Sequence, residues 1–442
     1  MIIKTLEELR QADTRTLSFT PMGLGSGVRM HPEGAAEFQQ QVVARFDLAP
    51  QVAEGTRRSF EDLRTAFAHG LFCYEIFTLI NDRSLLVLEQ ALRDRFIAHH
   101  GGSVRFVDEH GAQHAVAADS YAELYDVVRQ NPRRLLLLDG GQAIAFNGTL
   151  GGLRTWARRL GLLRGQRNRA IEQAISSLRN GAAHPGEHHL INPVEAALTL
   201  SDLAEIINHL WGVATPGGRL YPAPLRRNVV VVAWNTAGTQ LQMGLADELA
   251  TAADPTADAA ADPADPAWRA VIVQAVFRPE EGIADPGLRA FDARHEVTQY
   301  PADLLWWPGS LTDAAAWAAE HRPEPDECDY LDRTFLLRHD SAGLYWPMRP
   351  SVAAALPHAD RPGHWYAVKA DHPNDAYHHI RTLITATGCA RRGPCRQCHA
   401  ETLRIGRYHQ VMAAISTPAP PTPSLPSDTA TPWAHPRIRM IT

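Results

Sequence analysis

The sequence predicts an α+β multidomain protein, with a helical region first, a β-containing region second and a short helical module with several cysteines near the end. Two observations predict this order. Apolar residues recur at spacings of three and four through residues 58–99 and again through 193–211, which is helical periodicity. Beyond residue 217 the apolar residues instead form short runs such as NVVVVAW and WRAVIVQAVF, which are typical of strands.

The composition is that of a globular protein and contains no candidate membrane span. Hydrophobic residues make up 45% of the 442 positions, charged residues make up 21%, and the formal net charge is −6. The charged N-terminal sequence lacks an apolar signal core, so we expect a cytoplasmic protein with no membrane partner. Five cysteines are too few for a disulfide framework, which fits a reducing compartment.

The N-terminal half is expected to be mostly helical. Residues 1–55 form an entry segment with a Gly-rich, turn-forming stretch. Residues 58–99 predict one long helix, or two helices that meet near Asn81, with Cys73 packed in the apolar core. The elements expected next are a hairpin over 101–117, a helix over 121–129, a short strand or buried helix over 134–139, and amphipathic helices over 150–163 and 167–178.

The C-terminal half is expected to begin with strands and to end with helices. Strands are predicted at 228–234, 268–277, 334–339, 344–348 and 365–369. Helices are predicted at 375–387 and 401–415, on either side of a cysteine cluster. An acidic Ala/Asp/Pro stretch at 246–266 lacks the apolar residues that a core needs, so we expect a disordered insertion there.

These elements predict five parts of the chain. They are an entry segment 1–55, a helical domain 56–222, a β-containing domain 223–375, a helical cysteine module 376–416 and a flexible Pro/Ser/Thr-rich tail 417–442.

The candidate catalytic residues lie where one helix is expected to end and the next to begin. Asn180-Gly181 favours a helix C-terminus, and Asn192-Pro193-Val194-Glu195 has the form of a helix start, with a capping side chain followed by proline. Arg179 and His184 flank this junction. Their spacing alone is a weak signal, because it also occurs elsewhere in the chain, for example at Arg95/His100, Arg105/His110 and Arg404/His409.

The segment LRNGAAHP, followed by NPVEAALTLSDLAEIINHLWG, resembles the signature of the HEPN superfamily. Members are small helical domains with an arginine, a polar residue, a short spacer and a histidine at the junction of two helices. The resemblance covers roughly residues 59–213, and the hairpin expected at 101–117 departs from a simple four-helix outline. It implies a metal-independent endoribonuclease, often a toxin or an antiviral-defence effector, whose active site forms between the two subunits of a homodimer.

By this resemblance Arg179 is the motif arginine, Asn180 the polar residue and His184 the motif histidine. Cleavage through attack of the RNA 2′-hydroxyl on the neighbouring phosphate needs a base, an acid and positive charge on the phosphoryl oxygens. Histidine, whose unperturbed pKa is about 6.5, suits either proton-transfer role, and arginine stabilises the charged transition state. Asn180 is expected to hold the phosphate or to orient His184.

Two alternatives to catalysis stay open from the sequence. Arg179 can cap helix carbonyls while His184 merely opens a loop. A HEPN-like domain can also act as a non-catalytic dimerisation scaffold.

A second candidate site is the cluster GCARRGPCRQCH, which contains Cys389, Cys395 and Cys398. Thiolates two residues apart chelate zinc well, because a tight turn brings both sulfurs to one side. The cluster therefore predicts a structural zinc ion, with free reduced thiols as the alternative; no cofactor is expected for catalysis. The candidates for a fourth ligand are His399, His409, His379 and Cys328.

Arginines crowd the cysteine cluster. Because guanidinium groups bind phosphate with two parallel hydrogen bonds, Arg391, Arg392 and Arg396 are candidate contacts to RNA. A zinc-containing regulator that binds nucleic acid is therefore a further functional alternative.

Overall fold

The structure is a computed structural model. It describes residues 3–108, 110–118, 120–130, 136–139, 141–169, 171–172, 190–213, 220–221, 226–235, 241–245, 268–277, 300–308 and 331–415, the last without 342, 346, 349, 355, 357, 359, 360, 387, 390 and 396. Among these, residues 3–164 and 171–221 form one compact unit, here called the helical unit, and the remainder forms a second, the sheet unit. None of the described helices has the length and apolar character of a membrane span.

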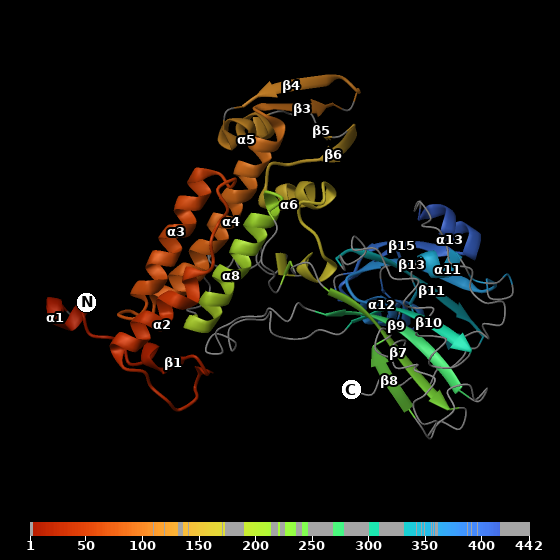
Figure 1. The fold of residues 1–442 in the computed structure, drawn as a ribbon. Coiled ribbons are helices and arrows are strands. Elements are labelled where there is room, and N and C mark those ends of the chain that lie inside the picture. Colours follow the sequence, from red (N-terminus) through yellow and green to blue (C-terminus); the bar gives the residue numbers. More distant parts are fainter. Residues whose placement is uncertain are drawn as a thin grey trace. The chain divides into compact units, whose positions relative to one another are not determined.

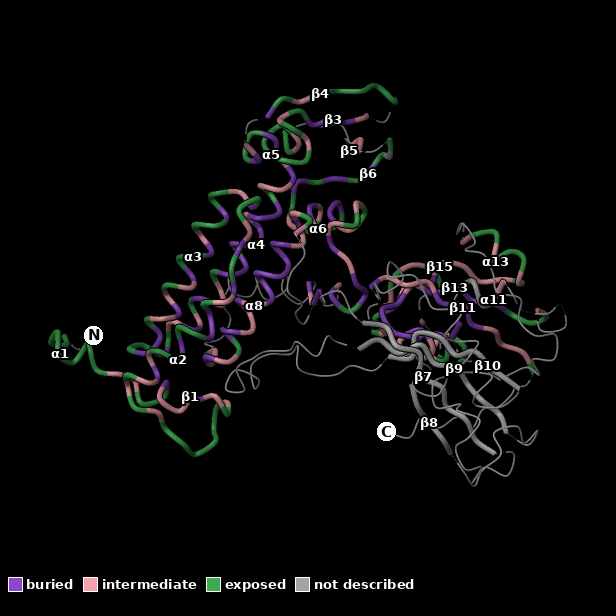
Figure 2. The backbone as a smooth tube through the Cα atoms, viewed as in Figure 1, coloured by how far each residue is buried: buried purple, intermediate pink, exposed green. Residues whose placement is uncertain are grey.

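The helical unit is built on a bundle of four helices that pack against one another (Figure 1). The bundle consists of α2 (Pro32–Ala44), α3 (Glu54–His69), α4 (Ile76–His100) and α8 (Pro193–Leu210). Their apolar faces turn inward, as the buried segments in Figure 2 show. The predicted start of α8 is confirmed, because the Asn192 side chain accepts a hydrogen bond from the Glu195 amide at 2.9 Å and Pro193 stands in the first turn.

The prediction for residues 58–99 is wrong about where its two helices meet. The break lies between α3 and α4 at residues 70–75, not near Asn81. Gly70 permits it, because a side chain there would collide with the ring of Phe77. Cys73 lies in this turn and is exposed, with its sulfur 3.5 Å from Glu75 Oε2, so the prediction of a core cysteine is also wrong.

The predicted hairpin at 101–117 is confirmed as part of a small antiparallel sheet that interrupts the helical bundle in sequence. The strand order is β4-β3-β5-β6. The elements are β3 (Ser103–Val107), β4 (Gln113–Ala117), α5 (Tyr121–Gln130), β5 (Leu136–Asp139), β6 (Gln142–Ala145) and α6 (Leu150–Arg159). Phe96 of α4 stacks on Phe146 and meets Trp156 of α6 edge-on, which joins the sheet region to the bundle.

Short elements precede the bundle. They are α1 (Leu6–Leu9), a 3-10 turn (Thr16–Ser18), β1 (Phe19–Thr20) and β2 (Gly23–Leu24).

The sheet unit contains two antiparallel sheets. The first has the order β10-β9-β7-β8 and consists of β7 (Arg226–Asn235), β8 (Leu241–Leu245), β9 (Trp268–Phe277) and β10 (Tyr300–Pro308). The second has the order β12-β11-β13-β15-β14 and consists of β11 (Arg333–Asp340), β12 (Gly343–Leu344), β13 (His364–Ala370), β14 (Gly393–Pro394) and β15 (Ala400–Gly406).

Helices cover both faces of the five-stranded sheet. They are α11 (Pro350–Ala354), α12 (Pro373–Thr385) and α13 (Tyr408–Ala414). Successive residues of a strand point to opposite faces. Phe335 and Leu337 therefore pack with Ile380 of α12, whereas Leu336 packs with Val411 of α13. The sheet thus has a core on each side, and α12 is held firmly on one of them.

The predicted helix at 401–415 is wrong in its first half. Residues 400–406 form β15, which pairs with β13, and α13 begins only at Tyr408. Pairing with a distant strand overrides the local helical pattern here. Of the strand expected at 344–348, the structure has only the short strand β12 at its start and a single bridge between Leu336 and Met348. The acidic stretch 246–266 and the tail from 417 lie outside the described residues.

A buried carboxylate, Asp371, ties segment 165–169 to the five-stranded sheet. It accepts hydrogen bonds from the amides of Gln166, Arg167 and Asp332, each at 2.9 Å. Burial raises its pKa, and the three amides act in the opposite direction by stabilising the charged form. Asp375, four residues on, pairs instead with the half-exposed Arg167 side chain at 2.8 Å.

We predict that Asp371→Asn destabilises the sheet unit by about 2 kcal/mol or more. The substitution replaces one carboxylate oxygen with an NH₂ group, which cannot accept the hydrogen bond from the Arg167 amide. Asp375→Asn, the matched control, should cost less than ~1 kcal/mol, as a solvent-screened pair does. Hydrogen exchange of the β11 and β13 amides measures both. Equal protection losses in the two variants would contradict the assignment.

Candidate functional site

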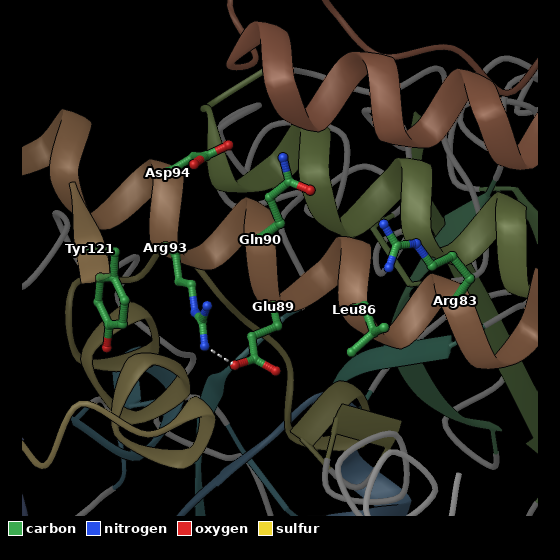
Figure 3. Close-up of a pocket in the computed structure, with 7 residues that line it drawn as sticks. All are labelled: Arg83, Leu86, Glu89, Gln90, Arg93, Asp94 and Tyr121. Carbon is green, nitrogen blue, oxygen red and sulfur yellow. Dashed lines mark hydrogen bonds and ion pairs between the residues drawn. The ribbon is translucent and has the colours of Figure 1, made fainter. Parts of the chain in front are cut away.

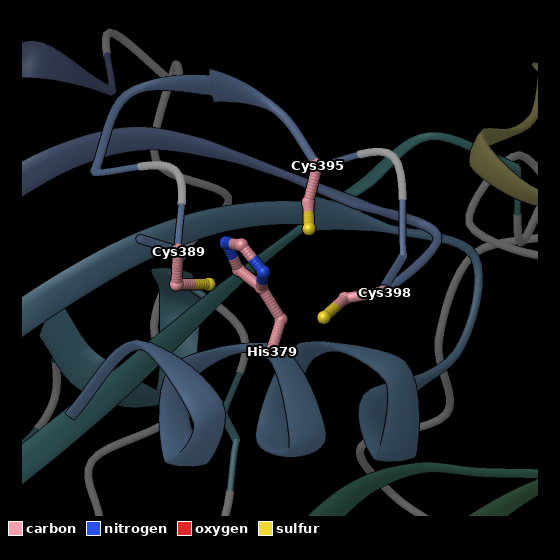
Figure 4. A group of neighbouring side chains, drawn as sticks. All are labelled: His379, Cys389, Cys395 and Cys398. Atoms are coloured by element: carbon pink, nitrogen blue, oxygen red, sulfur yellow. The ribbon is translucent and has the colours of Figure 1, made fainter. Parts of the chain in front are cut away.

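The three cysteines predicted as ligands lie together with one histidine (Figure 4). His379 comes from α12, Cys389 from the segment after it, and Cys395 and Cys398 from the connection between β14 and β15. The four potential ligand atoms all lie within 4.8 Å of one another. Tetrahedral zinc with bonds of about 2.3 Å to sulfur places its sulfur ligands about 3.8 Å apart. The group therefore needs little adjustment to hold a zinc ion.

The local sequence folds this loop into a tight, ligand-bearing turn. β14 and β15 pair antiparallel, and the Cys395 amide donates to the Ala400 carbonyl at 2.7 Å across the turn. His399 adopts a left-handed conformation with φ of 45° directly after Cys398, which turns the chain back into β15. These features bring the sulfurs of Cys395 and Cys398 to the same side of the turn.

His379 is oriented as a metal-binding histidine should be. Its Nε2 lies 2.6 Å from the Thr402 hydroxyl, which leaves Nδ1 as the nitrogen for an ion. Nδ1 is buried and has no hydrogen-bond partner among the described residues. Burial lowers the pKa of His379, so the ring is neutral near pH 7 and Nδ1 carries a lone pair. A buried acceptor without a partner is costly, and a bound cation would remove that cost.

The sulfurs also favour a cation. Burial, together with the neighbouring Cys395 and Cys389, raises the pKa of the Cys398 thiol to about 12. Three thiolates this close repel one another, so they do not all ionise without positive charge between them. A divalent ion supplies that charge and draws the protons off the thiols.

Of the four candidates for the fourth ligand, His379 is the one that lies with the three cysteines. His399 and His409 are exposed and lie outside the group, and Cys328 falls outside the described residues. A signal for His379 was present in the sequence. It stands between Ala376 and Ile380, on the buried face of an amphipathic helix.

The structure describes two of the three arginines that were predicted to contact RNA. Arg391 and Arg392 are exposed and lie between Cys389 and Cys395 in the chain, whereas Arg396 lies outside the described residues. The first two therefore present their side chains to solvent beside the metal-binding group.

The predicted catalytic residues Arg179, Asn180 and His184 lie in segment 173–189, outside the described residues. The ends of that segment are well fixed. Glu172 is buried and pairs with Arg158 through two hydrogen bonds, of 2.8 and 2.9 Å. At the other end the Ile191 amide donates to Thr78 Oγ1 of α4 at 2.9 Å. Both ends are thus anchored on the helical unit.

A pocket of about 530 Å³ lies along α4 and beside α5 (Figure 3). Arg93 pairs with the buried Glu89 and stands over the ring of Tyr121 at 5.3 Å, and Arg83 lines the pocket further along α4. Glu89 and Asp94 line it as well, so the pocket presents side chains of both charges. It contains none of the residues that the sequence marked as catalytic.

Comparison of the chain with protein-family models, with curated proteins and with solved structures finds no match.

We predict one thiolate-bound metal ion per chain at the group His379, Cys389, Cys395 and Cys398. Cobalt substitution should produce an intense sulfur-to-cobalt absorption band, because thiolate ligands transfer charge to the metal. Cys398→Ser should lose most of this band. Cys73→Ser, which alters an exposed cysteine elsewhere, should keep it; loss in both variants, or no band in the parent protein, would rule out the site.

Proposed function

We propose that this protein is a metal-independent endoribonuclease of the HEPN type, with Arg179, Asn180 and His184 as its catalytic residues. The observation that carries the proposal is the position of this motif directly before α8. The helix has the capped start that the motif region requires, and it packs with α3 and α4 in a helical bundle. The anchors at Glu172 and Ile191 support a catalytic segment held at both ends.

In this proposal the guanidinium of Arg179 binds the scissile phosphate and stabilises the negative charge that develops on it. His184 takes the proton from the 2′-hydroxyl or gives one to the 5′-oxygen that leaves. Two motifs facing each other in a homodimer would divide these two roles. Asn180 holds the phosphate or orients the imidazole.

The biological role we propose follows from the same resemblance. An intracellular ribonuclease of this type acts as a toxin or as an effector in antiviral defence. It therefore needs a trigger or a partner that restrains it.

The zinc ion that we propose for the cysteine group is structural. Three sulfurs and one imidazole complete a tetrahedral shell and leave no position for substrate or water. The ion would join α12 to the β14–β15 turn, while cleavage proceeds without it.

A second candidate function rests on Arg391 and Arg392. Their exposure beside the metal-binding group favours a zinc-containing module that binds nucleic-acid phosphates. This module can recognise the substrate of the ribonuclease or, in a non-catalytic scaffold, serve as the main activity.

The nuclease proposal predicts RNA cleavage in a metal-free buffer that contains EDTA. Arg179→Ala/His184→Ala should reduce the rate by about 100-fold or more, because it removes both phosphate stabilisation and proton transfer. The matched control is Arg105→Ala/His110→Ala, a pair with the same spacing whose two residues are exposed on the β3–β4 hairpin.

The control should cleave as the parent protein does. Gel analysis and sequencing of RNA ends measure the outcome. Equal cleavage by parent and motif variant, or none by the parent with any activator, would refute the proposal.

The binding proposal predicts that Arg391→Ala/Arg392→Ala weakens RNA binding and makes it less dependent on salt. Loss of two phosphate contacts to a single strand should lower the slope of log affinity against log salt by about 1.4. Arg57→Ala/Arg58→Ala, an exposed arginine pair on α3, is the control and should bind normally. Filter binding at several salt concentrations tests this, and unchanged affinity in the first variant would exclude the contact.

A further inference from the structure

A second group of potential metal ligands lies in the helical unit, far from the cysteines in sequence. His99 and His100 are the last two residues of α4, and Asp139 is the last residue of β5. Gly101, with φ of 59°, ends the helix and turns the chain into β3. Because β3 pairs with β5, Asp139 is brought back to the end of α4.

The ligand atoms of these three residues converge. The Nε2 atom of His99 lies 3.2 Å from the Asp139 carboxylate, and the Nε2 atom of His100 lies 3.8 Å from it. All three potential ligand atoms lie within 4.8 Å of one another. The carboxylate is oriented from behind by the Trp156 indole, which donates to Oδ2 at 2.9 Å. Hydrogen bonds of this kind hold the ligands of metal sites in place.

His100 is the residue that ordinary hydrogen bonding does not explain. Its side chain is 9% exposed, and its Nε2 atom is buried with no hydrogen-bond partner among the described residues. The distance of 3.8 Å to Asp139 is too long for a hydrogen bond. The ring rests against Phe96, with centroids 4.5 Å apart, so water does not replace the missing partner from that side.

The protonation states suit metal binding. Burial lowers the pKa of His100 to about 4, so the ring is neutral at pH 7. Burial opposes ionisation of Asp139, yet the hydrogen bonds from Trp156 and His99 lower its pKa, so it is a carboxylate. His100 therefore offers a nitrogen lone pair, and Asp139 a negative charge, to a cation.

We propose that His99, His100 and Asp139 form a binding site for a divalent transition-metal ion such as Zn²⁺ or Co²⁺. Two nitrogens and one oxygen suit these ions better than Mg²⁺ or Ca²⁺, which prefer oxygen ligands. Three protein ligands leave at least one coordination position for water or an anionic group. His99, whose side chain is 31% exposed, lies on the side open to solvent.

This site differs in kind from the cysteine group. The cysteine group offers four ligands and a closed shell, whereas the histidine site offers three ligands and an open one. The proposal does not depend on ribonuclease activity, because it concerns ion binding alone.

The test uses the full chain, first loaded with one equivalent of zinc per chain, which the four-ligand cysteine group takes up, and then titrated with Co²⁺. Calorimetry should detect one further ion per chain, and its spectrum should lack the intense sulfur-to-cobalt band. His100→Ala and Asp139→Asn should weaken this binding at least tenfold. His69→Ala, an exposed histidine on α3, is the matched control and should bind as the parent does.

His99→Ala keeps the proposal testable if a buried substitution prevents folding, since it removes a ligand at the surface. It should also weaken Co²⁺ binding at least tenfold while leaving circular dichroism unchanged. Absence of a second ion in the parent chain would overturn the site. So would parent-like binding by the His99→Ala variant, or equal losses in the His69→Ala control. RNA cleavage is measured separately, so failure here leaves the nuclease proposal standing.

Discussion

The carboxylate of Asp371 is the constraint on which the sheet unit depends. It lies between β13 and α12 in a buried position, where it accepts hydrogen bonds from three backbone amides. The next residue, His372, caps α12 by accepting a hydrogen bond from the Asn374 amide. The start of α12 is thereby fixed, and with it the position of His379 against Thr402 and the cysteines. A ligand that must lie within a few tenths of an ångström of its place needs such a rigid support.

The two groups of ligands illustrate how local chain geometry decides what a metal site can do. In the cysteine group, neighbouring residues of one turn supply two sulfurs, and a helix closes the shell with a buried imidazole. Such a site contributes its binding energy to folding. In the histidine site, two consecutive residues at a helix end meet one carboxylate at a strand end, and one imidazole stays at the surface. The second arrangement is suited to exchange of ions or of ligands bound to them.

The sequence predicted those features that local signals control. The capped start of α8 and the hairpin at 101–117 follow from residues next to one another in the chain, and both are confirmed. The strand β15 was mistaken for a helix, because its pairing with β13 is invisible locally. Cys389, Cys395 and Cys398 were recognised from their spacing, whereas the choice of His379 over His399 required the packing of α12. His99 and His100 come close to Asp139 because β3 pairs with β5, so no local sequence pattern predicts this contact.

The surrounding structure also matters for the proposed catalytic motif Arg179/His184, because its spacing is not unique. Other arginine–histidine pairs share its spacing, among them three that lie in described parts of the fold. In the first pair, the Arg95 guanidinium donates to the Leu210 carbonyl at the end of α8, and His100 is buried. The second pair, Arg105/His110, lies on the β3–β4 hairpin. In the third pair, Arg404 belongs to β15 and His409 to α13. The spacing of an arginine and a histidine therefore does not by itself identify a ribonuclease. What distinguishes the pair Arg179/His184 is its place in the sequence, between Glu172 and Ile191, which are both bonded to the helical unit, and before the capped helix α8.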